Sequence, residues 1–512
     1  MEMITVYCVS SLLGILFGIF TGIIPGIHVN TIVPILIGVS ASHIFPGIDI
    51  RALIFFLVSL AISHTFFDYI PGLFLGIPGD GAFALLPGEA MVMRGEGLEA
   101  LYLSAKGSLY GLLWASLLAS FFLSAKMLLD ADFVKNFYEI ISDNMFAILV
   151  VISILLIMTD KHKLWALFVF MSSGIFGILS FATPLVPGGA STFNVIFPAL
   201  SGVFGVSVLL LSLFESSSSI PFQKEPKENM LTKKQVQTAS ISGMISGSIV
   251  GLIPGLGSAN AAALFDVVKS WMVKRNDSST VQEPLYIVTT SSLNTADGIF
   301  AILALYFIHK SRSGASIGIE RLLNTEITSD FAVAIISVMV ISGIISFFVM
   351  KRIGAPIGKL VSLANYHGLS LAVITFLLVL ICLTTGFGGV LILVCGSLIG
   401  MIPPVVAVRR SQAMGFFLIP TMLFFSGYQA EVVSLMRFEA KINPSRIIGI
   451  YDLGLFILLS FVAGLISYVG NHYFFKSGVL RIWGMIVIAS ILILSTNYIF
   501  QFELLKFFEY FS

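Results

Sequence analysis

The sequence predicts an all-α, polytopic integral membrane protein with about 10–12 transmembrane helices plus broken or re-entrant helices. Of its 512 residues, 57% are hydrophobic and only 11% are charged, whereas soluble proteins carry about 25% charged residues. Many of the 46 glycines and 18 prolines lie inside apolar runs, where they break helices. Glycine and proline motifs also recur between the two halves, which predicts an inverted-topology internal repeat. The net charge of +1 argues against a nucleic-acid partner.

One frame of glycine and proline residues occurs twice. Each copy has three glycines four residues apart followed by Pro-Gly, and the two copies occupy Gly14, Gly18, Gly22, Pro25 and Gly26 and then Gly243, Gly247, Gly251, Pro254 and Gly255. The offset is the same at every position (243 − 14 = 229). Glycines at this spacing let another backbone approach one face of the helix. Pro-Gly then frees backbone groups, which in a membrane must be satisfied by protein or by a watery cavity. We therefore expect two copies of half a binding site.

The first half of the chain, 1–214, is predicted to be transmembrane repeat 1. Its apolar runs have the length of about 20 residues that crosses a bilayer. The stretch 71–88 is different, because its three Pro-Gly pairs favour a re-entrant hairpin or a broken helix. The full spans are expected at 4–24, 52–70, 101–125, 144–159, 164–182 and 195–214.

The polar segment 215–238 divides the chain and is predicted to be a cytoplasmic linker loop, because short cytoplasmic loops are rich in Lys and Arg. Residues 239–446 form the predicted transmembrane repeat 2, and 447–512 form two additional C-terminal helices. The distribution of Lys and Arg places equivalent loops of the two halves on opposite sides of the membrane, so repeat 2 is predicted to be inverted. The apolar runs lie at 285–308, 330–350, 369–385, 387–404, 412–430, 449–469 and 480–500.

Inverted halves with helices broken near the middle of the membrane are typical of secondary transporters. The N-terminus of a broken helix favours an anion, and its free carbonyl groups favour a cation. The substrate-binding candidates lie near the breaks and in the Pro-Gly-rich stretch, and they are Gly26, His28, Asn30, Thr31, Gly79, Asp80, Arg94, Gly255 and Ser258. The cation-coupling candidates offer neutral oxygens that suit Na⁺, or a carboxylate, and they are Ser63, Thr65, Asp68, Asn260, Asn294, Thr295 and Asp297.

Asp68 and Asp297 are the principal candidates for the cation site, because carboxylates inside a membrane are costly and usually functional. The two are related by the same offset as the glycine frames, and so are Ser63 and Ser292. For any single Ser or Thr, an ordinary hydrogen bond to a neighbouring helix is the alternative. No catalytic residue, cofactor or metal centre is predicted, apart from bound Na⁺.

Arg94 has two interpretations. Its planar fork can bind a carboxylate of the substrate through two hydrogen bonds, or it can be a cytoplasmic anchor paired with Glu96 or Glu89. The first half of the chain, which carries His28 and Asn30 beside its break, is expected to contact the substrate. The second half is expected to bind the cation.

The segments FGIFTGIIPGIHVNTIVPILIG and SGSIVGLIPGLGSANAAALF resemble the paired glycine-rich signatures of TctA, the large membrane subunit of the tripartite tricarboxylate transporters. The segment IPGDGAFALLPGEAMVMRGEGLEALYLSAKGSLYG resembles that family's IPG stretch and its G-x-P-M-x-x-x-G continuation. Gly88, Met91 and Gly95 match, and Ala90 replaces the proline. The family's second L-G-I-P-G stretch is absent, because that region is AILALYFIHKSRSGASIG.

The resemblance implies a permease of the plasma membrane that takes up citrate or a related tri- or dicarboxylate. Transport would be a symport with Na⁺ or H⁺, by alternating access between the repeats. The resemblance also implies two partners, a small membrane subunit and an extracytoplasmic binding protein. It implies no enzymatic activity.

Two alternatives remain open from the sequence. An intramembrane aspartyl protease is suggested by Asp68 and Asp80, because two carboxylates that share a proton activate water. However, the two aspartates are only 12 positions apart, with helix breakers between them, and Ile77 stands where the Gly-x-Gly-Asp motif of those enzymes has glycine. The second alternative is a channel or a non-transporting membrane scaffold.

Overall fold

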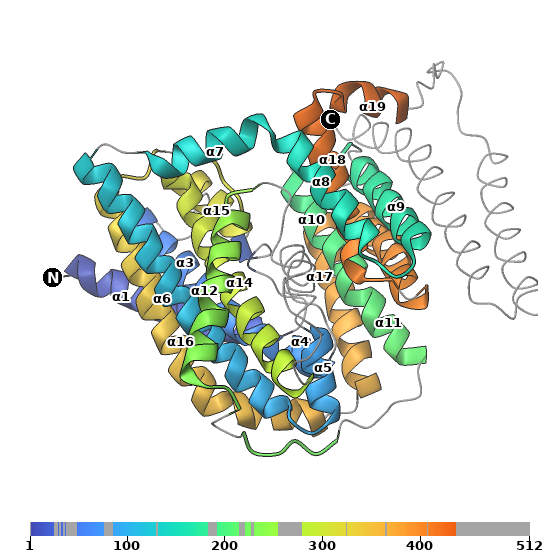
Figure 1. Ribbon diagram of the computed structural model, residues 1–512, viewed down its shortest axis with the longest axis horizontal. Helices are drawn as coiled ribbons and strands as arrows, with labels where there is room; N and C mark the ends of the chain where they lie inside the picture. Colours follow the sequence, from blue (N-terminus) through green and yellow to red (C-terminus); the bar gives the residue numbers. More distant parts are fainter. Residues whose placement is uncertain are drawn as a thin grey trace, which may run out of the picture. The chain divides into compact units, whose positions relative to one another are not determined.

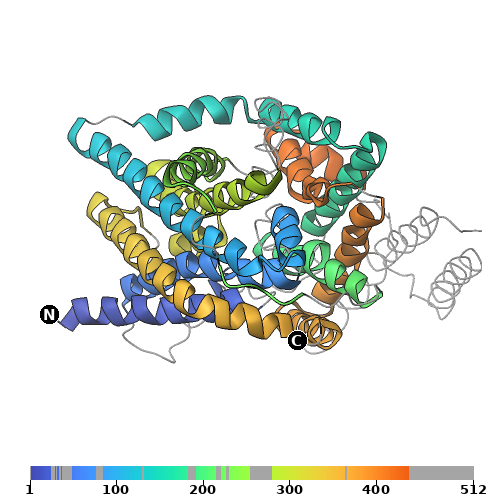
Figure 2. The ribbon, with the colours of Figure 1, turned by 60° about the horizontal axis from the view of Figure 1, so that its bottom comes forward.

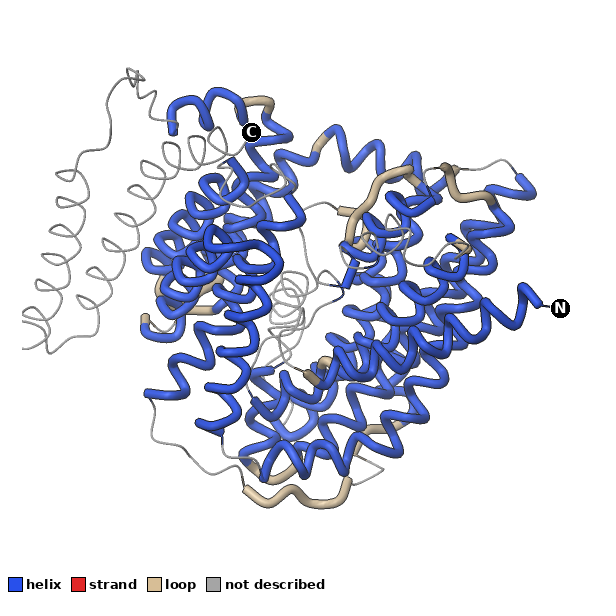
Figure 3. Tube along the Cα trace, turned by 180° about the vertical axis from the view of Figure 1, so that it is seen from behind, coloured by secondary structure: helices blue, strands red, loops and turns tan. Residues whose placement is uncertain are grey.

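The computed structural model is helical throughout the part of the chain that it describes, and none of that part lies in a strand (Figure 3). The predicted all-α class is therefore confirmed. The described residues are 2–24, 29, 32–33, 36, 49–75, 85–129, 132–182, 192–214, 221–226, 230–253, 279–323, 325–363, 366–406 and 408–436.

Figure 1 labels the α-helices, and the described part of the chain also has one π-helix (η1) and one 3₁₀-helix (η2). In chain order they are α1 (Glu2–Ile23), α3 (Ile50–Phe67), α4 (Tyr69–Leu75), α5 (Leu85–Met93), α6 (Gly97–Leu129), α7 (Phe133–Asp143), α8 (Met145–Met158), α9 (Lys163–Ala182), α10 (Thr192–Leu200), η1 (Ser201–Val206), α11 (Ser207–Phe214), α12 (Lys233–Val250), α14 (Ser279–Phe307), α15 (Gly314–Leu323), α16 (Ser329–Leu363), α17 (Tyr366–Val405), η2 (Arg410–Met414), α18 (Gly415–Ser426) and α19 (Gln429–Met436).

Six helices of the described part are long and apolar enough to cross a membrane, and the bent pair α7–α8 would make a seventh. The six spans are Met3–Ile23, Ile50–Phe74, Gly97–Leu129, Lys163–Phe181, Gln282–Phe307 and Ser329–Gly358. Shorter apolar helices run over Val195–Leu211, Ser370–Gly386 and Gly388–Pro404. These helices agree with a polytopic membrane protein. The total of about 10–12 spans concerns the whole chain and stays a prediction.

The contacts divide the chain into two compact units. Unit 1 contains 1–152 and 212–373, and unit 2 contains 153–211 and the residues from 374 onward. Unit 1 thus combines helices from both predicted repeats. The predicted division into 1–214, 215–238 and 239–446 follows sequence order and stays a prediction, and the region 447–512 lies outside the described residues.

Unit 2 has a buried polar contact at the turn between α8 and α9. Asp160, which is 5% exposed, accepts hydrogen bonds from the backbone N–H of Arg409 at 3.0 Å and from Gln412 Nε2 at 3.2 Å. A buried carboxylate needs such donors. In the same unit Pro198 lies inside α10, where it removes a backbone donor, and the chain then widens into the π-helix η1.

In unit 1, α1 and α3 pack against each other in parallel through the first glycine stripe. A Cβ added at Gly18 would lie 2.7 Å from Ser63 Cβ, and one added at Gly22 would lie 2.7 Å from Phe67 Cβ. A step of four residues along α1 therefore matches a step of four along α3. Only glycine allows the two backbones to come this close.

The helices α12 and α14 form a second parallel pair with the same contacts. Gly243 faces Thr289 O, Ser292 Cβ and Leu293 N, just as Gly18 faces Leu60 O, Ser63 Cβ and His64 N. Helix α14 therefore corresponds to α3 at the offset predicted for Ser63 and Asp68.

The glycines themselves correspond differently from the expected offset. By these contacts Gly243 takes the place of Gly18 and Gly247 takes the place of Gly22, so the offset is smaller by four (243 − 18 = 225). The shift is one helical turn. The sequence frame, which includes Pro-Gly, aligns Gly243 with Gly14, so the helix contacts differ from the sequence alignment by this one turn.

Helix α16 runs parallel to α3, and serines connect the two. Ser342 Oγ donates to Ser59 Oγ at 3.0 Å, and Ser346 Oγ donates to Ser63 Oγ at 2.9 Å. All four side chains are buried. Small residues that also form hydrogen bonds are typical of contacts between membrane helices.

Helix α6 makes the corresponding parallel contact with α14. A Cβ on Gly107 would lie 3.0 Å from Val288 Cα, and one on Gly111 would lie 2.7 Å from Ser292 Cα. Val288 and Ser292 correspond to Ser59 and Ser63 at the offset that relates α14 to α3. Each pair is thus flanked by a long helix at equivalent positions.

The long helices α6 and α16 run side by side in opposite directions (Figure 2). Gly354 packs against Leu101 near the start of α6, whereas Gly343, earlier in α16, packs against Leu112, later in α6. Because α16 is parallel to α3 and α6 is parallel to α14, the pair α1/α3 runs antiparallel to the pair α12/α14.

The close contact of the helix pairs gives a stability prediction. We expect Gly247→Ala to lower the free energy of unfolding by about 1–3 kcal/mol, the usual cost of overpacking, because its Cβ would lie 3.0 Å from Ala296 Cβ. Gly298→Ala, on α14, is the matched control, since nothing lies within 4 Å of a Cβ there. Thermal unfolding of the detergent-solubilised protein measures both. Equal melting temperatures for the two variants would contradict the packing described here.

Candidate functional site

The described site candidates belong to α3, α14 and the turn after α5. Asp68, Thr65, Asn294 and Asp297 are partly buried, Ser63 and Thr295 are fully buried, and Arg94 is exposed. The other candidates lie outside the described residues, and they are Gly26, His28, Asn30, Thr31, Gly79, Asp80, Gly255, Ser258 and Asn260. Their roles stay predictions.

The hydroxyl groups of the first half take part in helix packing. Ser63 Oγ donates to Ile15 O of α1 at 3.1 Å and accepts the hydrogen bond from Ser346. Thr65 Oγ1 donates to Ile62 O within α3 at 2.8 Å. The packing alternative, a hydrogen bond to a neighbouring helix or within the same one, therefore accounts for the contacts of both hydroxyls.

The second half repeats this arrangement. Ser292 Oγ donates to Ser240 O of α12 at 2.6 Å, as Ser63 does to Ile15 O of α1. Thr295 Oγ1 donates to Ser291 O at 3.0 Å, and it is completely buried. The Ser292 contact holds α14 against α12 at the register that the glycines set, and the Thr295 contact stays within α14.

The two aspartates occupy equivalent places but different local structures. The backbone N–H of Asp68 faces Gly22, and that of Asp297 faces Gly247. Asp68 lies at the junction where α3 ends and α4 begins, with its N–H donating to His64 O at 2.9 Å. Asp297 lies inside α14, which continues to Phe307. Asp68 therefore faces the last glycine of its stripe, whereas Asp297 faces the last two, because Gly251 also lies against Asp297 O.

His64 is a further polar side chain next to Asp68. It is only 3% exposed, and its Nδ1 lies 3.1 Å from Thr21 Oγ1 of α1. The residue that corresponds to His64 in α14 is Leu293. Four residues before the aspartate, the first half of the chain thus has an imidazole where the second half has leucine.

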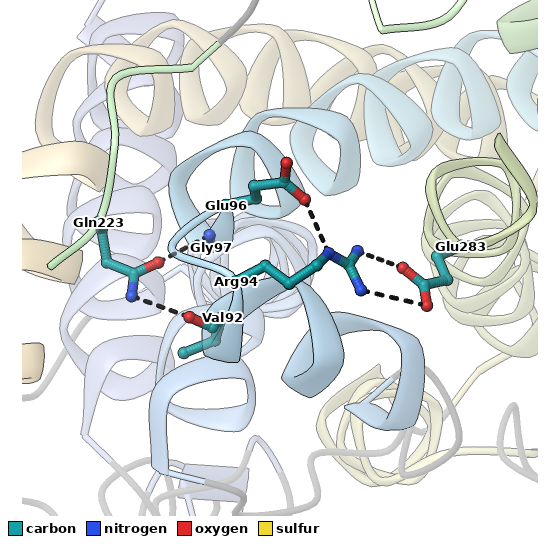
Figure 4. A network of polar contacts seen from close by, with 6 residues as sticks. All are labelled: Val92, Arg94, Glu96, Gly97, Gln223 and Glu283. Carbon is teal, nitrogen blue, oxygen red and sulfur yellow. Dashed lines mark hydrogen bonds and ion pairs between the residues drawn. The ribbon is translucent and has the colours of Figure 1, made fainter. Parts of the chain in front are cut away.

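Arg94 binds two carboxylates of the protein (Figure 4). Its guanidinium pairs with Glu283 through Nη1 and Nη2, and its Nε donates to Glu96 Oε2 at 3.1 Å. The hydrogen bond to Glu283 raises the pKa of Arg94 against a smaller opposing effect of burial. Glu96 was an expected partner. Glu283 was missed, since no spacing rule connects two residues so far apart in the chain.

The polar linker binds to the same turn (Figure 4). Gln223, which is 2% exposed, accepts a hydrogen bond from the Gly97 N–H at 2.7 Å and donates to Val92 O at 3.1 Å. The N–H of Lys224 donates to Gly95 O at 2.8 Å. The turn between α5 and α6 thus fixes both the linker and, through Arg94, the start of α14.

Among the described residues, no group of three or more His, Cys, Asp or Glu side chains could hold a metal ion. The described cation-coupling candidates on α3 and α14 carry hydroxyl, amide and carboxylate oxygens. Such oxygens suit a monovalent hard cation better than a transition metal, which prefers His or Cys.

Comparison with known proteins gives one family. A model of the "Tripartite tricarboxylate transporter TctA family" matches residues 9–415 of the chain. An uncharacterized protein of Methanocaldococcus jannaschii is 28% identical over 436 residues, which cover 81% of this chain and 98% of that protein. No solved structure matches the chain.

The ion pair of Arg94 gives a second prediction. We expect Arg94→Glu and Glu283→Arg each to lower the melting temperature, because each places like charges together. The double variant should recover most of the loss, with a coupling energy of about 0.2–1 kcal/mol, as in other exposed pairs. Glu89→Arg is the control, since Glu89 is exposed on the neighbouring α5. Additive effects of the two reversals would show that the pair contributes nothing.

Proposed function

Because the chain belongs to the tripartite tricarboxylate transporter TctA family, we propose that it is a secondary active transporter for a carboxylate anion such as citrate or a related tri- or dicarboxylate. Transport is coupled to Na⁺ or H⁺ and proceeds by alternating access between two inverted repeats. The family match spans residues 9–415, which confirms the resemblance seen in the sequence. The chain is a multi-pass membrane protein.

The observation that carries the proposal is the arrangement of the two helix pairs. The pairs α1/α3 and α12/α14 make the same glycine contacts and run in opposite directions. Inverted repeats that meet near the middle of the bilayer are the usual framework for alternating access, because each half can rock against the other. The inverted repeat is therefore part of the proposal.

We assign cation coupling to Asp68 and Asp297. Asp68 faces Gly22, the last glycine of the first stripe, and Asp297 faces Gly247 and Gly251, the last two of the second. A segment with Pro-Gly follows each stripe. A carboxylate inside a membrane is costly and is usually there for a function. Its negative charge offsets the positive charge of the bound Na⁺ or H⁺. Neutral oxygens of Asn294 and of the predicted ligand Asn260 complete this side of the site.

Substrate binding falls to the segments after the helix pairs and to the Pro-Gly-rich stretch, with Gly26, His28, Asn30, Thr31, Gly79, Asp80, Gly255 and Ser258 as the proposed contacts. Arg94 stays a substrate candidate only if the anion displaces Glu283 from its guanidinium fork. We favour a structural function for Arg94, in which it positions the α5–α6 turn, because its guanidinium already pairs with Glu96 and Glu283.

The family functions in a tripartite transporter with other subunits and a binding protein. We propose that this chain likewise works with a small membrane subunit and an extracytoplasmic binding protein in the plasma membrane. It is not an enzyme in this proposal. No observation favours the channel or the scaffold. The aspartyl protease is disfavoured because Asp68 has a counterpart in Asp297, and a protease that uses Asp68 and Asp80 has no use for Asp297.

Uptake into proteoliposomes tests the function. The protein, supplied with its partner subunits, should accumulate at least one labelled tri- or dicarboxylate when a Na⁺ or pH gradient is imposed. Accumulation should be absent without the gradient. Folded protein that takes up no carboxylate under any gradient would contradict the proposal. Cleavage of a membrane peptide that is lost in Asp80→Asn would favour the protease instead.

Asp68→Asn and Asp297→Asn test the coupling sites within the same assay. Each variant should lose most of the gradient-dependent uptake while it keeps the melting temperature, because Asn preserves shape and removes the charge. Asp330→Asn is the matched control, since Asp330 is exposed in the first turn of α16. Uptake at the level of the unmodified protein in both variants would remove the two aspartates from the mechanism.

A further inference from the structure

We propose that α7 lies in the membrane–water interface, with the face formed by Phe133, Phe137 and Ile140 inserted among lipid acyl chains. This inference does not depend on the transported substrate. Between the spans expected at 101–125 and 144–159, the structure has a separate helix, Phe133–Asp143.

The apolar side of α7 is divided into two stripes. Val134, Tyr138 and Ile141 are 5%, 5% and 8% exposed and pack on the protein. The second stripe remains open, since Phe133, Phe137 and Ile140 are 52%, 44% and 67% exposed. Their spacing of four and three residues places the exposed three on one face of the helix.

The remaining face of α7 is polar. Lys135, Asn136, Glu139 and Asp143 are exposed there. A helix with an exposed apolar face and a polar face on its other side is stable at the membrane–water interface. The three ionisable groups in α7 sum to a charge of −1. Apolar burial, not attraction to anionic headgroups, must therefore hold the helix at the bilayer.

Continuity with the lipid-facing surface identifies the occupant as lipid. Helix α6 is a candidate span, and its last residues, Leu128 and Leu129, are 81% and 73% exposed immediately before α7. Helix α8 begins directly after α7 at an angle of 71° to it, and its Phe146 is 46% exposed. The exposed apolar surface thus continues from α6 through α7 into α8, and Figure 1 shows α7 running from beside the end of α6 toward α8.

The buried stripe fixes the depth of α7. Arg312 Nη2 donates to Tyr138 OH at 2.5 Å, and its Cζ lies 5.0 Å from the ring centroid. Lys310 Nζ lies 5.3 Å from the same centroid. Tyrosine together with Arg and Lys is typical of the lipid headgroup level. This contact therefore places α7 at the headgroup level, which is also where its exposed apolar face would reach the acyl chains.

Site-directed spin labelling tests this position. Single cysteines at Phe137 and Ile140, with Lys135 and Glu139 on the polar face as matched controls, are introduced after replacement of Cys8, Cys382 and Cys395. The labelled protein is reconstituted in phosphatidylcholine vesicles with and without phosphatidylglycerol. Labels at 137 and 140 should be accessible to oxygen and shielded from a water-soluble nickel reagent, and labels at 135 and 139 should show the reverse. The pattern should be the same in both lipids.

Two outcomes would overturn the proposal. Nickel accessibility at all four positions would place α7 in water. Loss of both accessibilities at 137 and 140 when the partner subunits are present would show that protein, not lipid, covers the face. If the cysteine-free chain does not fold, Phe137→Trp and Glu139→Trp in the otherwise unmodified chain replace it, and brominated lipid should add quenching only for the former.

Discussion

The direct contact between helix backbones at the glycine stripes is the constraint on which unit 1 depends. At Gly18 and Gly22 of α1, and at Gly243 and Gly247 of α12, the neighbouring helix approaches so closely that a Cβ has no room. Between membrane helices such packing replaces the hydrophobic effect, because lipid is as apolar as the side chains. The stripes fix the register of each pair, and the register fixes where Asp68 and Asp297 lie. Packing and the candidate cation sites are thus set by the same residues.

This register gives the serines and the aspartates of the two helix pairs different functions. Ser63 and Ser292 donate hydrogen bonds to backbone carbonyl groups of α1 and α12, so they stabilise each helix pair. The aspartates lie farther along the helices. Asp68 faces the last glycine of its stripe, and Asp297 faces the last two of its own. Helix α3 ends beside Asp68, whereas α14 continues past Asp297. The two pairs therefore share a packing plan and differ at the place where transport would need different ligands.

Much of this was predictable from the sequence. Composition determined the fold class, and the glycine spacing predicted the close helix contacts. The alignment of the two stripes was wrong by one turn, because matching residue types aligned Gly243 with Gly14, whereas Gly243 packs on α14 as Gly18 packs on α3. The partner of Arg94 was also missed. Glu283 is distant from it in the chain, and a local pattern carries no information on a contact that only the fold creates.

The antiparallel arrangement of the two helix pairs predicts that α3 and α12 start on opposite sides of the membrane. Labelling of single cysteines in intact and permeabilised cells with a membrane-impermeant maleimide tests it directly. The positions are Arg51 at the start of α3 and Lys233 at the start of α12, which are both exposed. The account predicts that one cysteine reacts in intact cells and that the other reacts only after permeabilisation. Reaction of both from the same side would contradict it.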